Sequence, residues 1–321
     1  MMYDITALGE LLIDFAPVST DADGYPTMAA HPGGAPANFL AAANKLGANV
    51  AFLGKVGNDA FGKLLIQTCK QAGIETRGIQ MDDKTFTTLA FVTLDETGDR
   101  EFSFARKPGA DTQLTFEELE LSLIDDCTAF HFGTLSLTGE PARTCTQKAV
   151  AYAKSKGKLI SFDPNLREPL WDDLEEAKRQ ILWGLQQADV VKISDNEVEF
   201  LFGCSPEEGA RKLVDEFGVK LVFATLGPNG AHFCNKKCSG TAGKLTTPLK
   251  IVDTTGAGDI CGGTAVREVL RAGAAPDELD EATLTNIVKL ACTTATLSAT
   301  KFGGISSVPS RGEVLDLLAK Q

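Results

Sequence analysis

The sequence predicts a layered α/β protein with a mainly parallel central sheet. Short apolar runs of strand length alternate along the chain with longer stretches in which apolar residues recur at helical spacing. Several helical stretches end at a glycine, as helices commonly do. With 321 residues the chain is long enough for one large domain or two ordinary ones, and the alternation of strands and helices favours parallel strands joined by right-handed crossovers.

The predicted core strands are apolar throughout, which is typical of strands covered by helices on both faces. They lie at residues 3–8, 49–54, 129–133, 158–163, 189–194 and 220–226. Between them, helical patterns cover residues 37–47, 59–73, 140–157 and 173–188. Gly47, Gly73 and Gly157 stand where the residue after a helix C-cap is expected.

Two β-rich segments, residues 11–32 and 85–106, interrupt this alternation. In the second, residues 88–94 and 100–106 alternate on either side of DETGD (95–99), which is a hairpin pattern. The segments could extend the edge of the main sheet, or they could form a small lid inserted into the α/β domain. We favour the lid because each segment leads into a candidate binding motif, so the predicted core is 1–10, 33–84 and 107–321.

Composition narrows the classes of ligand. The formal net charge of −12 argues against nucleic acid and anionic membranes as partners, since both require a basic face. No apolar run approaches the roughly 20 residues of a membrane span, and the N-terminal segment lacks the features of a signal peptide, so we expect a cytoplasmic protein. The eight cysteines suit reduced thiols better than a disulfide scaffold. Cys234 and Cys238 could form half of a zinc site, but no second pair follows at usable spacing.

The strongest chemical signal is DTTGAGD, residues 253–259, directly before a helical pattern at 260–270. Glycines at a helix start let backbone N–H groups converge on an anion, and the helix dipole favours negative charge there. A carboxylate at Asp259 can then accept a proton from an attacking hydroxyl. Taken alone, the motif is better interpreted as a glycine-rich turn with a solvated aspartate. GNDAFGKL (57–64) is not a phosphate loop, because Leu64 replaces the metal-binding hydroxyl and the segment has a helical pattern.

Four further motifs accompany DTTGAGD: GGAPANF (33–39), DPNLR (163–167), NEVE (196–199) and TLGPNG (225–230). With them the chain resembles the ribokinase family of sugar kinases throughout its length. GELLIDF (9–15), ADTQLT (110–115), HFGTLSL (131–137) and FDPNLREPLW (162–171) resemble the fructokinase branch. The resemblance implies a three-layer α/β/α ribokinase-like fold with a small β lid. It also implies transfer of the ATP γ-phosphate to the 6-hydroxyl of D-fructose.

The resemblance also implies roles for individual residues. Asp259 would be the base, and the amides of Gly256, Ala257 and Gly258 would form the anion hole. The sugar would be bound by Asp14, Gly33, Gly34, Asn38, Phe104, Arg106, Asn165 and Arg167. The nucleotide would be bound by Lys192, Asn196, Thr225, Gly227, Gly230, Gly256, Gly258 and Cys292. Glu199 would hold Mg²⁺ through water, and Asp253 and Thr255, with carbonyls from 299–304, would hold a monovalent cation such as K⁺.

Three positions depart from the family pattern. Cys292 replaces a usual asparagine near the nucleotide, Cys261 replaces a frequent aromatic residue, and Phe302 replaces a commonly basic one. Two other functions stay open. Arg106 and Arg167 could pair with the carboxylate of 2-keto-3-deoxygluconate, and a non-catalytic member could serve as a sugar-binding or scaffold protein.

The lid also suggests an assembly. Alternation places Ala90 and Val92 on one face of the lid hairpin and Leu89 and Phe91 on the other, so both faces are apolar. One face can close over a sugar, and the other needs a partner. We therefore expect a homodimer formed through the lid, as the family resemblance also implies.

Overall fold

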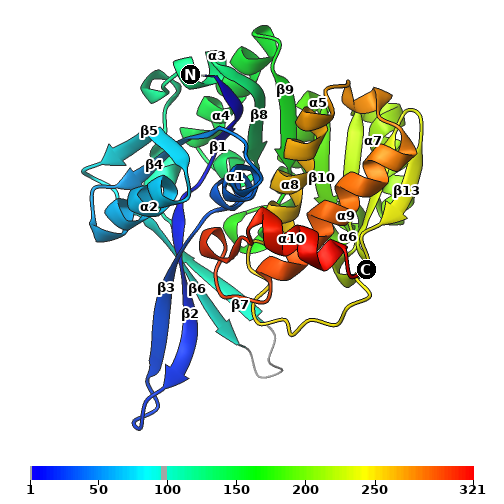
Figure 1. Cartoon of the computed structure of the whole chain (residues 1–321). Helices are drawn as coiled ribbons and strands as arrows, with labels where there is room; N and C mark the ends of the chain where they lie inside the picture. The colour runs from blue at the N-terminus through cyan, green and yellow to red at the C-terminus, as the bar shows by residue number, and fades with distance from the viewer. Residues whose placement is uncertain (1, 95–99) are drawn as a thin grey trace.

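The computed structural model describes residues 2–94 and 100–321, and over these residues its centre is a nine-stranded sheet (Figure 1). The strand order is β13-β12-β11-β10-β9-β8-β1-β4-β5. Neighbours from β11 to β5 run parallel, whereas β12 and β13 are antiparallel to their neighbours. The strands are β1 (Tyr3–Leu8), β4 (Val50–Gly57), β5 (Ile74–Asp82), β8 (Cys127–Gly133), β9 (Leu159–Asp163), β10 (Val190–Ser194), β11 (Leu221–Thr225), β12 (Ala231–Asn235) and β13 (Ser239–Ala242).

The six core strands predicted from apolar runs correspond to β1, β4, β8, β9, β10 and β11. Strands β5, β12 and β13 were not predicted from apolar runs. Both β5 and β13 are edge strands: β5 mixes buried with exposed residues, and β13 has only exposed and half-buried ones, so neither has a continuous apolar run. The five-residue strand β12 contains the polar residues His232 and Asn235, both buried.

Helices cover both faces of this sheet, which confirms the three-layer prediction. Two buried apolar clusters mark the faces: one joins the sheet to α1, α8 and α9, and the other joins it to α3, α4, α5, α6 and α7. The helices are α1 (Ala35–Lys45), α2 (Ala60–Gln71), α3 (Ser122–Asp125), α4 (Ala142–Ser155), α5 (Leu174–Gln187), α6 (Asp195–Phe202), α7 (Pro206–Phe217), α8 (Ala257–Ala272), α9 (Glu281–Ser298) and α10 (Arg311–Leu318). Gly47, Gly73 and Gly157 follow the C-caps of α1, α2 and α4 with positive φ, as predicted.

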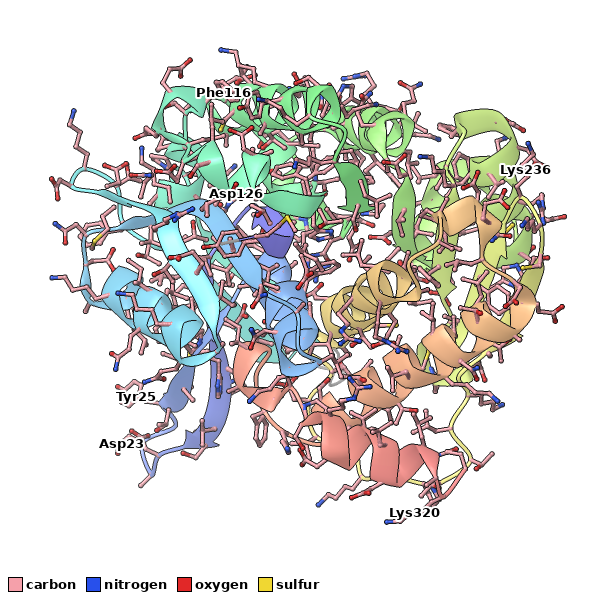
Figure 2. The ribbon with its side chains drawn as sticks, turned by 45° about the horizontal axis from the view of Figure 1, so that its top comes forward. Asp23, Tyr25, Phe116, Asp126, Lys236 and Lys320 are labelled. Carbon is pink, nitrogen blue, oxygen red and sulfur yellow. The ribbon has the colours of Figure 1, made fainter. Side chains whose placement is uncertain are left out.

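The two β-rich segments form a separate four-stranded sheet that projects from the core (Figure 1). Its order is β3-β2-β6-β7, with β2 (Leu12–Thr20), β3 (Pro26–Gly33), β6 (Thr88–Leu94) and β7 (Arg100–Ala105). The segments therefore do not extend the main sheet. Figure 2 shows Asp23 and Tyr25 at the tip of the β2–β3 hairpin, far from the core. The predicted turn at 95–99 lies outside the described residues.

The two faces of this projecting sheet, called the lid sheet below, have different surroundings. Leu12, Asp14 and Phe104 line a cavity at the core. On the opposite face Phe15 stacks on Phe91, with 5.2 Å between ring centroids, and meets Phe61 of α2 edge-on at 5.6 Å. The expectation that this second apolar face needs a partner from outside the chain is therefore wrong at the base of the lid sheet.

The helices of the described part of the chain include none long and apolar enough to cross a lipid bilayer.

Candidate active site

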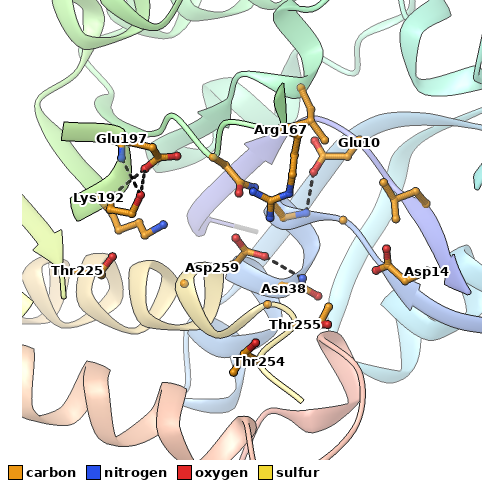
Figure 3. A pocket seen from close by; sticks show the side chains of 18 of the residues that line it. Glu10, Asp14, Asn38, Arg167, Lys192, Glu197, Thr225, Thr254, Thr255 and Asp259 are labelled. Carbon is orange, nitrogen blue, oxygen red and sulfur yellow. Dashed lines mark hydrogen bonds between the residues drawn. The ribbon is translucent and has the colours of Figure 1, made fainter. Parts of the chain in front are cut away.

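The main candidate site is a cavity of about 450 Å³ at the carboxyl ends of β1, β9, β10 and β11, beside the lid sheet (Figure 3). Ligand sites of open α/β sheets lie at this edge. The lining residues are Glu10, Leu12, Asp14, Gly34, Ala35, Asn38, Phe104, Leu135, Asn165, Arg167, Lys192, Ser194, Glu197, Thr225, Thr254, Thr255, Gly256, Gly258 and Asp259. In Figure 3 Asp259 lies between an end that holds Thr225, Lys192 and Glu197 and an end that holds Glu10 and Asp14.

Asp259 lies in the first turn of α8 and is buried, with 7% of its surface exposed. Helix α8 begins after Gly256, whose φ of 75° is a conformation that favours glycine. The amide of Asn38 on α1 donates to Asp259 Oδ2 at 2.9 Å. Burial raises the pKa of Asp259, whereas the charge of Lys192 and the hydrogen bond from Asn38 act in the opposite direction. The carboxylate is thus a stronger proton acceptor than an exposed aspartate.

Two of the three residues predicted to form the anion hole line the cavity. Gly256 and Gly258 line the cavity at the N-terminus of α8. Ala257 does not line it, and its N–H donates to the Thr254 carbonyl at 3.2 Å. The structure therefore places the Ala257 amide in the turn that leads into α8, which differs from the predicted role. The helix N-terminus still offers partial positive charge next to Asp259.

The side chain of Lys192, on β10, also lies at the N-terminus of α8. Its Nζ pairs with Asp163 Oδ2 at 3.1 Å, and both side chains are buried. Burial raises the pKa of Asp163 to about 7, although the charge of Lys192 opposes the shift. A Cβ on Gly258 would lie 3.0 Å from Lys192 Nζ. Glycine at 258 therefore lets the ammonium group approach the N-terminus of α8.

The predictions that Asn196 contacts the nucleotide and that Glu199 holds Mg²⁺ through water are wrong. Asn196 and Glu199 are exposed on α6 and do not line the cavity. Glu197 lines it instead and accepts hydrogen bonds from Ser194 and from the Leu166 amide, each at 2.8 Å. Ser194 and Glu197 form a capping box at the start of α6, which turns Glu197 inward, whereas Glu199 lies about 200° further around the helix. The S-x-x-E spacing in the sequence could have identified Glu197.

Two carboxylates line the end of the cavity next to the lid sheet. Burial raises the pKa of Asp14 to about 7, with the charge of Arg167 acting in the opposite direction. Glu10 was not identified from the sequence, although it lies in the quoted GELLIDF motif. Its Oε1 accepts the Ala35 amide of α1 at 2.7 Å, and burial raises its pKa to about 7.

Gly33 and Gly34 allow this close packing. A Cβ on Gly33 would lie 2.4 Å from Asp14 Oδ2, and one on Gly34 would lie 2.4 Å from the Glu10 carbonyl oxygen. Gly34 lines the cavity, whereas Gly33 leaves room for Asp14 and is not part of the lining. Asn165, with a positive φ of 43°, and Phe104 line it as predicted.

Of the two arginines predicted to contact the sugar, only Arg167 lines the cavity. The Arg106 guanidinium is buried and pairs with Asp111 Oδ2, at 2.9 Å from Nε and 2.6 Å from Nη2. It also donates to Thr138 Oγ1 at 2.9 Å and to the Leu135 carbonyl at 2.7 Å. The prediction of a direct sugar contact by Arg106 is therefore wrong in this structure, because its donors are used inside the fold.

A second cavity of about 310 Å³ adjoins the first and shares Thr225, Thr254 and Gly258 with it. It lies between the loop after β11, helix α8 and helix α9. The further residues that line it are Gly227, Pro228, Gly230, Gly243, Ile251, Ala257, Cys261, Cys292, Ala295, Thr296 and Ala299. The structure thus gathers Thr225, Gly227, Gly230 and Cys292, all predicted to contact the nucleotide, around one largely apolar space.

The residues predicted to hold a monovalent cation also lie together. Asp253 Oδ1 accepts the Thr255 amide at 2.9 Å and the Thr255 hydroxyl at 2.7 Å. Asp253 Oδ2 accepts the Gly303 amide at 3.0 Å, and the Asp253 amide donates to the Ala299 carbonyl at 3.1 Å. These bonds join the loop before α8 to the 299–304 segment.

Comparison with known proteins gives consistent results. Residues 2–311 match the family model described as pfkB family carbohydrate kinase. Fructokinase-2 of Solanum lycopersicum is 42% identical over 318 residues, covering 98% of this chain and 95% of the relative. Fructokinase-1 of Zea mays is 40% identical over 320 residues, covering 98% of both chains.

Solved structures show the same likeness. A fructokinase with bound ATP from Xylella fastidiosa superposes with a TM-score of 0.91 at 29% identity, covering 100% of this chain and 99% of that one. A Vibrio cholerae O395 fructokinase in its fructose, ADP and calcium ion bound form gives a TM-score of 0.86 at 31% identity, covering 99% of both chains. A putative ribokinase II from E. coli in complex with ATP and Mg²⁺ gives 0.86 at 28% identity, with full coverage of both chains. The ribokinase-like fold predicted from the sequence is confirmed.

Proposed function

This chain belongs to the pfkB family of carbohydrate kinases, and from that membership we propose that it is an ATP-dependent fructokinase acting on the 6-hydroxyl of D-fructose. The observation that carries the proposal is the position of Asp259. Its buried carboxylate lies at the N-terminus of α8, between the acidic end of the main cavity and the end that opens toward the largely apolar second cavity. The sugar occupies the first end and the nucleotide occupies the second, so the reacting groups meet at Asp259.

Asp259 accepts the proton of the sugar hydroxyl as that oxygen attacks the γ-phosphorus. Asn38 holds the carboxylate in place through its 2.9 Å hydrogen bond. The amides at Gly256 and Gly258 and the Lys192 ammonium lie where negative charge builds on the transferred group. Such preorganised positive groups lower the barrier without reorganising during the reaction.

Mg²⁺ fits the nucleotide end through water and phosphate oxygens. No group of three or more His, Cys, Asp or Glu side chains that could hold a metal occurs among the residues described, and Mg²⁺ usually keeps several waters and one or two carboxylates. Glu197 is the carboxylate placed to orient those waters, in the role predicted for Glu199. When bound, the ion neutralises phosphate charge. The E. coli relative named above was solved with ATP and Mg²⁺.

Fructose suits the sugar end better than an acidic sugar does. Glu10 and Asp14 both line this end and accept hydrogen bonds from hydroxyl groups, whereas they would repel a substrate carboxylate. Arg106, which could have paired with such a carboxylate, is already paired with Asp111. Both observations disfavour 2-keto-3-deoxygluconate, and the fructokinase relatives support the neutral sugar.

A coupled ADP-release assay tests the proposal with fructose, ribose, 2-keto-3-deoxygluconate, glucose and adenosine as acceptors. We expect the highest kcat/KM with fructose. Asp259→Asn keeps the shape and the hydrogen bond but removes proton acceptance, so kcat should fall roughly 10²–10⁴-fold while ATP binding, measured by calorimetry, persists. Asp215→Asn on the exposed part of α7 is the matched control. Wild-type turnover in Asp259→Asn would reject the assignment of Asp259 as the base. No ADP release by the unmodified protein with any of the five acceptors would instead indicate a non-catalytic sugar-binding protein.

A further inference from the structure

The second cavity, which we assign to the nucleotide, contains two thiols from neighbouring helices. Cys261 lies in α8, two residues after Asp259, and Cys292 lies in α9 (Figure 1). Both line this cavity, and they are 6% and 7% exposed. All eight cysteines of the chain are free. Each of the two thiols therefore faces a space that a small oxidant can enter when the nucleotide is absent.

The helices that carry the two thiols, α8 and α9, pack against each other, and each thiol shifts the pKa of the other. The interaction with Cys292 lowers the pKa of Cys261, and the charge of Lys192 acts in the same direction, although burial opposes both. The same interaction and burial raise the pKa of Cys292. Cys261 is therefore the more acidic of the two thiols. A thiolate beside a second thiol is the usual arrangement of a redox-active cysteine and its resolving partner.

We propose that Cys261 and Cys292 are a reversible oxidation site, at which a peroxide-class oxidant converts the two thiols into a disulfide that disables the nucleotide site. The Cys261 thiolate attacks one peroxide oxygen and breaks the O–O bond, which gives a sulfenic acid and one water after protonation. The Cys292 sulfur then attacks the Cys261 sulfur, forming the S–S bond and releasing a second water. Two electrons from the thiol pair reduce one hydrogen peroxide to two waters.

The disulfide must draw α8 and α9 together where the two thiols lie. An S–S bond is about 2.05 Å long, much shorter than a contact between two thiols, so at least one side chain has to move. Cys292 would leave its packing against the chain at Gly243, where a Cβ would lie 2.7 Å from its Sγ. Movement of Cys261 would shift the first turns of α8, which carry Asp259 and the amide groups around Gly258. A displacement of about 1 Å at catalytic groups lowers turnover by roughly 10²-fold.

Bound nucleotide should protect the pair, because it would fill the cavity that both thiols line. This part of the inference, and the effect on turnover, rest on the proposed kinase function. The formation of the linkage itself does not.

The test treats the whole purified protein, freed of reductant, with increasing hydrogen peroxide. Intact mass should show the loss of two hydrogens, and peptide mapping should join the peptides that contain residues 261 and 292. Fructose-dependent ADP release should fall by roughly 10²-fold and return with dithiothreitol. A non-hydrolysable ATP analogue should slow both the linkage and the loss of activity.

Cysteine variants test which residues form the linkage. The activity of each variant after peroxide treatment is compared with the activity of the same variant before treatment. Cys292→Ser should form no linkage and should instead gain oxygen at Cys261. Cys204→Ser and Cys238→Ser, which lie outside both site cavities, should respond as wild type does. A linkage between Cys234 and Cys238 instead, or full activity in the linked protein, would overturn the proposal. Because mass reports the linkage without turnover, an inactive kinase would refute the proposed function and leave this test standing, and an active kinase that never links would refute this inference alone.

Discussion

Asn38→Ala tests whether Asn38 tunes Asp259 or binds the sugar, the role implied by the family motif. Asn38 Nδ2 donates to Asp259 Oδ2 at 2.9 Å, and the two residues are 3% and 7% exposed. A hydrogen bond to a charged group contributes about 1.5–3 kcal/mol, and one pKa unit corresponds to about 1.36 kcal/mol. Removing the bond should therefore raise the pKa of Asp259 further, in addition to the increase caused by burial.

The readout is the pH dependence of kcat/KM for fructose between about pH 5 and pH 9, since this profile reports the essential base of the free enzyme. Because Asp259 must be ionised to accept a proton, the acid limb of the profile should move to higher pH. At pH values where Asp259 is protonated, kcat/KM of the variant should be roughly 10- to 100-fold below that of wild type. At high pH, where Asp259 is ionised in both proteins, most of this difference should disappear. Asn44→Ala is the matched control, because Asn44 donates only to Ala48 and Gly73 carbonyls near the other end of α1.

An unchanged acid limb with a raised KM for fructose would refute this reasoning. It would show that Asn38 acts as a sugar ligand, and that its bond to Asp259 contributes little to the acidity of the base.

Four other changes test separate parts of the site. Glu10→Gln keeps an oxygen for the Ala35 amide but removes the buried charge. Burial raises the pKa of Glu10 to about 7 from an ordinary 4.5. As the pH rises through this window, the unfolding free energy of wild type should therefore fall by about 3 kcal/mol relative to that of the variant. The same stability difference between the two proteins at both ends of the window, measured by urea unfolding, would contradict this prediction. Arg106→Ala leaves Asp111 unpaired and should lower the unfolding free energy by about 3–5 kcal/mol, whereas Arg167→Ala should raise the KM for fructose with little change in stability; the reverse pattern would restore a sugar contact to Arg106. We propose that K⁺ orders the loop at Asp253 and Thr255, so replacing K⁺ by a bulky organic cation at equal ionic strength should slow turnover about tenfold if the order is worth about 1.4 kcal/mol, and equal rates would remove the site. Val18 and Tyr25 near the tip of the lid sheet are 66% and 69% exposed, so we propose a homodimer through this sheet that Val18→Asp with Tyr25→Asp converts to monomers in light scattering; a wild-type monomer with full activity would reject it.

The parts of the fold that the sequence predicts are those encoded in local pattern. Runs such as residues 3–8 are apolar throughout and become buried parallel strands, and the hairpin pattern at 88–106 becomes β6 and β7. Strand β5 was missed because it is an edge strand that mixes buried, half-buried and exposed residues, so its pattern contains no continuous apolar run. Local pattern also located Asp259, since the glycines before it are needed for the turn into α8.

The chemistry of the site depends on contacts between distant segments, and pattern alone does not specify them. Glu199 matched a family motif, yet one capping box turned Glu197 inward and left Glu199 in solvent. The sequence leaves Arg106 available for an acidic sugar, but in the structure Asp111, five residues later, holds its guanidinium. Local spacing permits that pair, but only the fold buries both partners. Burial likewise raises the pKa of Glu10, Asp14 and Asp163 to about 7, although their sequence neighbours are ordinary. The acidity of this site is therefore a property of how β1, the lid sheet and β9 converge on the N-terminus of α8, and substitutions that loosen this convergence should change the pH profile before they change the fold.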